Sequence, residues 1–172
     1  MRKMEQLKKL VRGKKVISVI CNQWGDTGKG KFSDYFSCYW ADVVARGTGG
    51  NNAGHTVVLN GKEKVFHILP SGIGHDKKGI VSILGNGMVI DLKVLLEELS
   101  EMDAEGMTYK NLMISQDAQV IMPYHISQDL KKNQSQKKGG IGSTGRGIGP
   151  CYVDKIARRG IQIGDLYDEK IL

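Results

Sequence analysis

The sequence is poor in cysteine, in aromatic residues and in long apolar runs, and each shortage argues against a class of protein. Its 3 cysteines, Cys21, Cys38 and Cys151, are widely spaced and odd in number, which argues against a disulfide framework and favours a reducing, cytoplasmic setting. Phe, Trp and Tyr make up only 6% of the 172 residues, and the lysines are scattered, so nucleic-acid binding is not expected despite the net charge of +7. No run approaches the roughly 20 apolar residues that span a membrane.

The N-terminal residues differ in character from the rest of the chain. Residues 1–10 are charged and contain no apolar core of a signal peptide, so they predict a helical extension over residues 1–14. Residues 15–172 are long enough to bury the core of one domain. The net positive charge suits an anionic ligand.

Glycine, by contrast, is abundant and unevenly placed. The 23 glycines concentrate at residues 25–30, 47–54 and 139–149, between segments with strand or helix patterns. Clusters of this kind predict several ligand-binding loops on one scaffold. We refer to residues 23–31 as the first loop, to 49–56 as the second loop and to 139–150 as the third loop.

Apolar runs and amphipathic patterns alternate along the chain. They predict strands at 16–21, 42–46, 80–84, 112–115, 119–122 and 160–164, and helices at 28–39, 92–102, 126–132 and 150–157. Asn60-Gly61 predicts the turn of a hairpin between 56–59 and 64–68. The alternation predicts an α/β, P-loop-like fold with a largely parallel central sheet flanked by helices and a β-hairpin insertion.

Local signals refine this scheme. Along helix 92–102, Leu92, Leu95, Leu96 and Leu99 share one face, and Asp91 is the expected N-cap. Gly85-Asn86-Gly87 predicts a turn, and residues 133–149 predict a polar, mobile loop.

The first loop joins a predicted strand to a predicted helix, an arrangement in which free backbone N–H groups and the helix dipole favour phosphate. Its spacing from Gly25 through Gly30 to Lys31 fits a P-loop, but Phe32 stands where a P-loop has the Ser or Thr that holds magnesium. Asp26 is the available oxygen ligand. An acid at this place indicates a metal ligand, a base, or both.

The other two loops offer complementary chemistry. The second loop combines glycines, which allow close backbone approach, with asparagines suited to a purine edge or a phosphate, and with His55. The remaining histidines, His67, His75 and His125, are expected to be structural or surface residues. The third loop offers hydroxyls, N–H groups and one fixed cation, although composition alone also fits a flexible surface linker.

Taken in order, these motifs resemble the adenylosuccinate synthetase family. The matching stretches are QWGDTGKGK at 23–31, GGNNAGHTV at 49–57, HILPSGI at 67–73, GNG at 85–87, PYH at 123–125 and GSTGRGIGPCYVDKIARR at 142–159. The similarity runs from residue 16 to the end of the chain and implies the N-terminal part of a GTP/IMP-binding domain.

The resemblance implies a GTP-dependent ligation of IMP and L-aspartate to adenylosuccinate, in AMP biosynthesis and purine salvage. In the family, the first-loop aspartate takes the N1 proton of IMP, and O6 then attacks the γ-phosphate of GTP. The amino group of aspartate displaces phosphate from the resulting 6-phosphoryl-IMP. Asp26 is thereby expected to be the base, and His55 the acid that stabilises the transferring phosphoryl group.

The same resemblance implies the binding residues. Magnesium would be held by Asp26 and the carbonyl of Gly54. Arg158 would reach the neighbouring subunit's IMP, which implies a homodimer. GTP contacts are expected from Gly25, Asp26, Thr27, Gly28, Lys29, Gly30, Lys31, Gly54, His55 and Thr56. IMP contacts are expected from Asp26, Thr27, Gly28, Lys29, Asn52, Ala53, Gly54, His55, Thr144 and Arg158.

Three motif positions depart from the family pattern. Thr27 replaces the glutamate of the usual G-D-E-G-K-G-K loop, Thr48 stands where the family usually has glutamine, and Ser143-Thr144 stands where it usually has two threonines. The chain is also less than half as long as common family members. The parts that recognise aspartate and guanine are expected to lie in the unmatched half, so the chain alone is expected to be inactive as a ligase. A non-catalytic purine-nucleotide-binding module and another P-loop-like NTPase are the alternatives.

Overall fold

A parallel sheet lies at the centre of the computed structural model, which describes residues 2–20, 22, 28–52, 54–59, 62–135 and 142–170. Strands β1 (Val43–Gly49), β4 (Val81–Ile90) and β5 (Leu112–Ile114) lie in that order, and the short β6 (Gln119–Val120) also pairs with β4. All of these pairings are parallel. The predicted α/β class with a largely parallel sheet is therefore confirmed.

A separate antiparallel hairpin is formed by β2 (His55–Leu59) and β3 (Lys62–Phe66). Its register pairs His55 with Phe66 and Leu59 with Lys62, which confirms the predicted hairpin. The predicted turn residues Asn60 and Gly61 lie outside the described residues.

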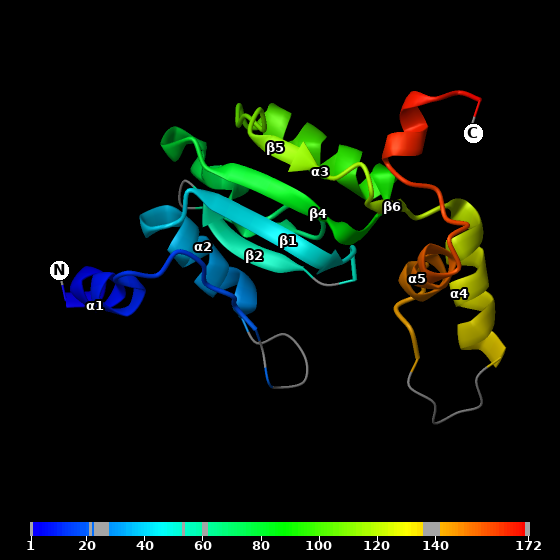
Figure 1. Cartoon of the computed structure of the whole chain (residues 1–172), viewed down its shortest axis with the longest axis horizontal. Coiled ribbons are helices and arrows are strands. Elements are labelled where there is room, and N and C mark those ends of the chain that lie inside the picture. The colour runs from blue at the N-terminus through cyan, green and yellow to red at the C-terminus, as the bar shows by residue number, and fades with distance from the viewer. Residues whose placement is uncertain are drawn as a thin grey trace.

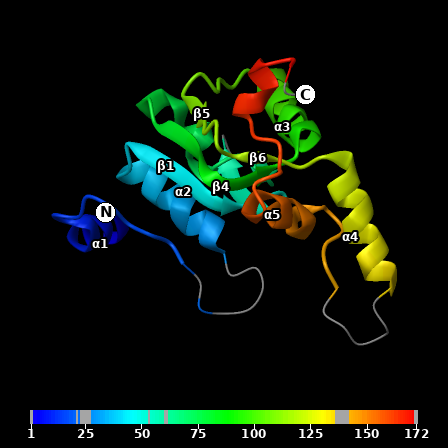
Figure 2. The same cartoon turned by 45° about the vertical axis from the view of Figure 1, so that its right-hand side comes forward.

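The helices are α1 (Arg2–Val11), α2 (Lys29–Tyr39), α3 (Leu92–Ala104), α4 (Pro123–Ser135) and α5 (Ile148–Ile156), with the 3-10 helices η1 (Ser71–Lys78) and η2 (Gly164–Tyr167). In Figures 1 and 2, α4 and α5 pack side by side, and α1 lies apart from the sheet. Both α4 and α5 begin earlier than predicted. Pro150 lies in the first turn of α5, where its missing N–H is tolerated.

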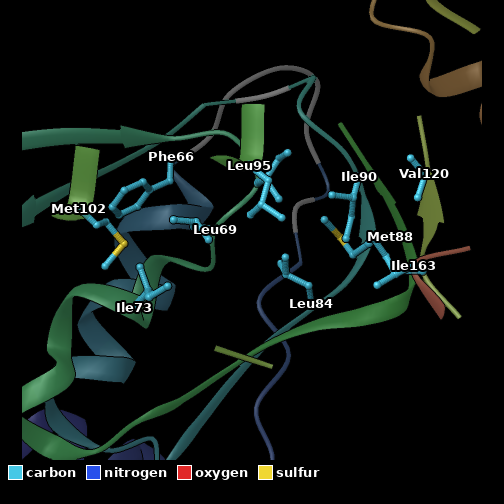
Figure 3. Packing of buried hydrophobic residues seen from close by; sticks show 12 residues of the cluster. Phe66, Leu69, Ile73, Leu84, Met88, Ile90, Leu95, Met102, Val120 and Ile163 are labelled. Atoms are coloured by element: carbon cyan, nitrogen blue, oxygen red, sulfur yellow. The ribbon is translucent and has the colours of Figure 1, made fainter. Parts of the chain in front are cut away.

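The main hydrophobic core covers one face of the sheet. Leu84, Met88 and Ile90 of β4 pack there with Leu95 and Met102 of α3 (Figure 3). The carboxylate of Asp91 accepts hydrogen bonds from the N–H groups of Lys93 and Val94, as expected of the N-cap of α3. Because α3 follows β4 directly, this cap fixes the angle at which the helix returns across the sheet.

The prediction for Leu96 was wrong. Leu96 is 62% exposed, whereas Glu98 is only 5% exposed and lies on the buried side of α3. The core side carries Leu92, Leu95, Leu99 and Met102. Glu98 can be buried because its carboxylate accepts backbone hydrogen bonds, which a hydrophobicity pattern does not register.

The strand predicted at 16–21 is absent. Residues 16–20 form no strand, Cys21 lies outside the described residues, and Val16 and Ile20 are 82% and 77% exposed. The apolar pattern favours a buried strand, but a strand also needs a neighbour to complete its hydrogen bonds. None of the described residues provides one for this segment.

The turn predicted at 85–87 is also wrong, because β4 continues through Gly85, Asn86 and Gly87. The glycines serve close approach between strands instead. A Cβ at Gly87 would lie 2.2 Å from the carbonyl oxygen of Gly47, and the register of β1 and β4 shifts between Arg46 and Thr48.

Residues near the third loop are more helical than predicted. A loop was expected at 133–149, but residues 133–135 belong to α4 and residues 148–149 belong to α5. Residues 136–141 lie outside the described residues. The strand expected at 160–164 is reduced to a single antiparallel bridge between Gln119 and Gln162, because η2 begins at Gly164.

Candidate nucleotide site

The described end of the first loop forms the start of α2. Gly28 is the N-cap and has φ 77° and ψ 20°, a left-handed conformation that glycine adopts without strain. The N–H of Lys31 donates to the Gly28 carbonyl at 3.0 Å. The N–H groups that precede it in a helix have no intrahelical acceptor, so this terminus suits an anion. Gly25, Asp26 and Thr27 lie outside the described residues.

The first and second loops meet at a small hollow of about 60 Å³. Small residues are required at this contact, because a Cβ at Gly30 would lie 3.1 Å from the Cβ of His55. At Gly54, a Cβ would lie 2.8 Å from Cγ1 of Val65. The hollow is lined by Gly28, Gly30, Lys31, Gly54, His55 and Thr56.

Many of the residues expected to contact GTP phosphates are thus brought together. Lys29 lies in the same turn of α2. Asn52 belongs to the turn that precedes β2, and Ala53 lies outside the described residues. Among the described residues, no group of His, Cys, Asp and Glu side chains gathers as a metal centre.

Arg46 and Glu98, which sequence reasoning did not select, anchor the segment that follows the hairpin. The guanidinium of Arg46 donates to the carbonyls of His67, Ile68 and Gly50. The carboxylate of Glu98 accepts from the N–H groups of Ile68 and Leu69, at 3.1 and 2.9 Å. The N–H of His67 also donates to Glu98.

Arg46 holds the carbonyls, and Glu98 the N–H groups, of one stretch of backbone. Burial lowers the pKa of the Arg46 guanidinium, and the Glu98 carboxylate acts in the opposite direction. Since Arg46 also holds Gly50, the second loop is tied to the core through a buried polar network. The signal available in the sequence was a charged residue within each of two apolar patterns, Arg46 in a predicted strand and Glu98 beside the leucine face of a predicted helix.

The described part of the third loop is held by α4. Asp129 accepts the N–H of Gly147 at 3.0 Å and the hydroxyl of Ser143. Asn133 accepts the N–H of Ser143 at 2.8 Å and donates to its carbonyl at 3.1 Å. Asp129 and Asn133 are four residues apart on α4 and therefore share one side of the helix. The side chain of Thr144 is exposed beside them.

The second and third loops are connected to each other. The guanidinium of Arg146 contacts the carbonyl of Asn51. The N–H of Gly49 donates to the hydroxyl of Tyr152 at 2.8 Å, and that hydroxyl donates to the carbonyl of Gly87 at 2.8 Å. The expected IMP contacts of both loops are therefore carried on one connected frame, although Thr144 does not line the hollow.

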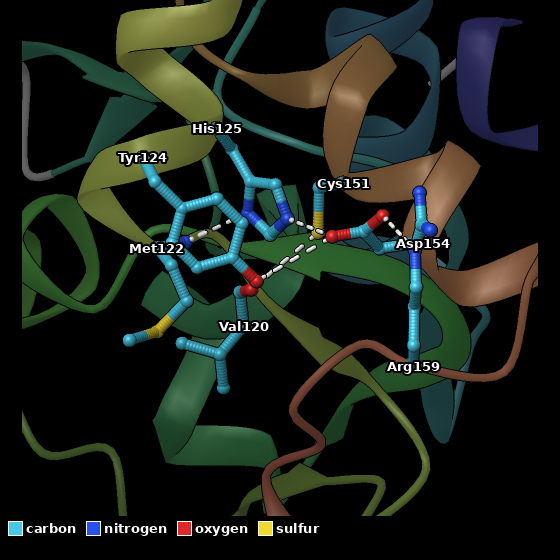
Figure 4. A network of polar contacts seen from close by, with 7 residues as sticks. All are labelled: Val120, Met122, Tyr124, His125, Cys151, Asp154 and Arg159. Atoms are coloured by element: carbon cyan, nitrogen blue, oxygen red, sulfur yellow. Dashed lines mark hydrogen bonds and ion pairs between the residues drawn. The ribbon is translucent and has the colours of Figure 1, made fainter.

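Arg158 lies just beyond α5 and is exposed, with a φ of 57° that is unusual for a residue other than glycine. Its neighbour Arg159 donates to Asp154 at 2.8 Å, and Asp154 also meets Nε2 of His125 at 3.1 Å (Figure 4). Nδ1 of His125 accepts the N–H of Met122 at 2.9 Å, so Nε2 carries the proton that faces Asp154. His125 is thus a buried structural residue, as predicted.

A parallel α/β sheet with a glycine-capped helix N-terminus facing a second glycine loop is the arrangement typical of nucleotide-binding α/β proteins. The sequence profile of the family described as "Adenylosuccinate synthetase" matches residues 18–172. The chain therefore belongs to the adenylosuccinate synthetase family.

Individual relatives give the same result. An adenylosuccinate synthetase from Syntrophobacter fumaroxidans is 51% identical over 158 residues, which are 91% of this chain and 36% of the relative. The structure of fully ligated adenylosuccinate synthetase from Plasmodium falciparum matches with a TM-score of 0.74 and 38% identity, over 87% of this chain and 34% of that one. The succinoaminodeoxyadenylate synthetase of cyanophage S-2L, bound to dGMP and dATP, matches with a TM-score of 0.63 and 30% identity, over 87% and 41%.

The chain thus spans about a third of the length of the curated relatives that it matches. In the part of the chain that the structure describes, no helix is both long and apolar enough to cross a membrane.

Proposed function

We propose that the chain supplies the phosphate-transfer part of a GTP-dependent ligase that joins IMP and L-aspartate to form adenylosuccinate. The observation that carries this proposal is the hollow where the start of α2 meets Gly54, His55 and Thr56. Phosphoryl transfer depends mainly on positioning and on neutralising charge. A helix N-terminus, Lys31 and an imidazole around one small space offer both.

In this proposal, the Asp26 carboxylate takes the proton from N1 of IMP, and O6 attacks the γ-phosphorus of GTP while the bond to GDP breaks. His55 donates to the transferring phosphoryl group and stabilises its charge. The amine of L-aspartate then attacks C6 of 6-phosphoryl-IMP, and phosphate leaves. Both residues lie in glycine-rich loops, where the backbone can approach a ligand closely.

Magnesium fits the donor set of this hollow. The lining residues offer oxygen ligands, the carbonyl of Gly54 and the hydroxyl of Thr56, and Mg²⁺ prefers oxygen and keeps several waters. Asp26 and the carbonyl of Gly54 would hold the ion. Phe32 stands where a P-loop has a magnesium-binding hydroxyl, so other oxygen ligands are needed here. When bound, the ion would neutralise charge on the phosphates. The protein's own groups, Lys31 and the N-terminus of α2, act toward the same charge.

IMP would contact Asp26, Thr27, Gly28 and Lys29 of the first loop. The further contacts proposed are Asn52, Ala53, Gly54 and His55 of the second loop, Thr144 of the third, and Arg158 from a neighbouring subunit of a homodimer. The exposure of Arg158 beyond α5 is compatible with a reach across an interface. A cytoplasmic location follows from the same proposal, since the substrates are those of purine metabolism.

Calorimetry on the 172-residue chain tests the binding half of this proposal. IMP should bind more tightly than dGMP, whereas GTP and dATP, each with magnesium, should bind similarly because the hollow is lined by phosphate-binding and not base-binding groups. Gly30→Val should abolish triphosphate binding, since the side chain would meet His55. Gly149→Val is the matched control, because a Cβ there meets nothing within 4 Å.

The outcomes separate the alternatives. Failure of the folded chain to bind either nucleotide would overturn the proposal, as would equal losses from Gly30→Val and Gly149→Val. Triphosphate binding without IMP binding would favour another P-loop-like NTPase.

A further inference from the structure

The positive charge of the chain is concentrated in residues 1–15. This segment contains seven of the 25 lysines and arginines but only one of the 18 acidic residues, so it carries +6 of the net charge of +7. Residues 16–172, with the remaining 18 basic and 17 acidic residues, are almost neutral at +1. The basic residues of the segment are Arg2, Lys3, Lys8, Lys9, Arg12, Lys14 and Lys15. Nearly all of the net charge therefore lies outside the family match, which covers residues 18–172.

This charge belongs to α1 and to the residues directly after it. Helix α1 (Arg2–Val11) lies apart from the sheet in both views (Figures 1 and 2). Among the elements that the structure describes, none packs extensively against α1. The hollow where the first and second loops meet is lined by residues between 28 and 56, and α1 contributes none of them. The charge of α1 is thus available to a partner other than the nucleotide.

Apolar residues recur along α1 at a helical spacing. Met4, Leu7 and Leu10 follow one another at intervals of three, so these positions lie along one side of the helix. Leu10 is 65% exposed, whereas the next residue, Val11, is only 7% exposed. A helix that combines basic residues with an apolar stripe is typical of segments that lie in the interface of an anionic membrane. There the stripe enters the edge of the acyl layer, and the basic residues meet lipid phosphates.

A nucleic acid is the other anionic partner to consider, and it fits this segment less well. Residues 1–15 contain no Phe, Trp or Tyr on which a base could stack. Phosphate binding by lysine and arginine also gives no reason for an apolar stripe on the same helix. A lipid surface accounts for both the charge and the stripe.

We propose that residues 1–15 are a peripheral anchor that binds the surface of an anionic phospholipid bilayer. Helix α1 would lie in the plane of the surface, with Leu10 toward the acyl chains. The basic residues would be held by the negative potential of the headgroups, which reaches about 10 Å at 0.1 M salt. This is association with a surface and not a membrane span, and it does not depend on the nucleotide site.

Co-sedimentation of the 172-residue chain with lipid vesicles tests the proposal. The chain should bind mixed vesicles of phosphatidylglycerol and phosphatidylcholine at least about tenfold more tightly than vesicles of phosphatidylcholine alone. Salt at about 1 M should release it, because the screening length falls to about 3 Å. Binding that is no stronger to the anionic vesicles would overturn the proposal.

One pair of variants tests the charge. Lys8→Gln combined with Lys9→Gln should weaken binding to the anionic vesicles about tenfold or more, because each lysine near the surface adds to the attraction. Lys8→Arg with Lys9→Arg keeps the charge and should restore binding. The matched control is Lys131→Gln with Lys132→Gln, which removes two lysines from exposed positions of α4 and should leave binding unchanged.

A second pair tests the apolar stripe. Leu10→Gln should weaken binding about fivefold or more, because the leucine no longer transfers apolar surface into the lipid. Leu96→Gln is the matched control, since Leu96 is 62% exposed on α3 and Leu10 is 65% exposed on α1. Equal weakening by a variant and its control would contradict the proposal.

Two further measurements complete the test. Circular dichroism checks that each variant is folded, and calorimetry with IMP should give the same affinity for the Lys8→Gln, Lys9→Gln variant as for wild type. Failure of the anchor is therefore distinguishable from failure of the nucleotide site. Binding to a DNA duplex that survives Leu10→Gln, without binding to anionic vesicles, would assign the segment to nucleic acid and overturn the proposal.

Discussion

The second and third loops are held in place by different kinds of chemistry. The second loop and the segment after the hairpin depend on Arg46 and Glu98, and Glu98 is 5% exposed. The third loop depends on Asp129 and Asn133 of α4, which hold Gly147 and Ser143. Asp129 is 3% exposed, and its carboxylate accepts from neutral donors, an N–H and a hydroxyl. Two loops expected to share one ligand can thus be fixed either by two opposite charges or by a buried carboxylate that accepts from neutral donors.

The two sets of contacts differ in how much free energy it costs to break them. A buried charge that loses its partner is expensive, so the second loop is fixed with the fold itself. In the third loop, Asp129 has no opposing charge to leave unpaired, and Ser143 is exposed, so water can replace part of what its contacts lose. We therefore expect that breaking the third-loop contacts costs less than breaking those of the second loop.

The largest expected effect is at Glu98. Glu98→Ala should lower the free energy of unfolding by about 3–5 kcal/mol, because it leaves backbone N–H groups without acceptors and Arg46 without its opposing charge. Urea unfolding followed by circular dichroism measures this. Glu97→Ala is the matched control, since its side chain is 59% exposed and forms a salt bridge with Lys93 at 3.9 Å. Equal losses for the two variants would show that the second loop does not depend on a buried charge.

A smaller effect is expected at Asp129. Asp129→Ala should lower the free energy of unfolding by about 1–3 kcal/mol, the penalty for leaving the N–H of Gly147 unpaired. The neighbouring Gln128→Ala, at an exposed position, should change it by less than about 0.5 kcal/mol. A loss as large as that of Glu98→Ala would erase the contrast between the loops.

The smallest effect is expected at Asp154, near the end of α5, the helix that follows the third loop. Hydrogen bonds from Arg159 and then His125 lower the pKa of Asp154 below its ordinary value of 3.8. The stability that ionised Asp154 contributes is therefore present above about pH 4 and is lost as the pH falls through the lowered pKa. Asp154→Asn should slightly lower Tm at pH 7, and the difference from wild type should narrow below pH 4. A difference that is constant with pH would contradict this role.

Sequence patterns predicted much of this molecule, and the failures have physical causes. The alternation of strands and helices, the hairpin and the Asp91 cap were predicted because each depends on residues close together in sequence. The strand at 16–21 failed because pairing is not local, and the turn at 85–87 failed because the glycines serve contact with Gly47. Glu98 was missed because the N–H groups that donate to it lie about 30 residues away in sequence. Asp129, Asn133 and Tyr152 were missed for the same reason, since they hold the loops without belonging to a glycine cluster.

The motifs were sufficient to identify the family, whereas the close approach of Gly30 to His55 depends on the fold. Asp26, the proposed base, lies outside the described residues, so its role needs a chemical test.

The most direct test is adenylosuccinate formation by a chimera in which residues 18–172 replace the matching part of the Syntrophobacter fumaroxidans relative. The account predicts that the chimera is active, that Asp26→Ala abolishes turnover, and that His55→Asn lowers it at least about 100-fold, the range of general acid–base catalysis. His75→Asn, which removes a side chain that pairs with Asp34 and does not line the hollow, should change turnover only a few-fold. Near-normal turnover by the Asp26→Ala chimera would contradict the account.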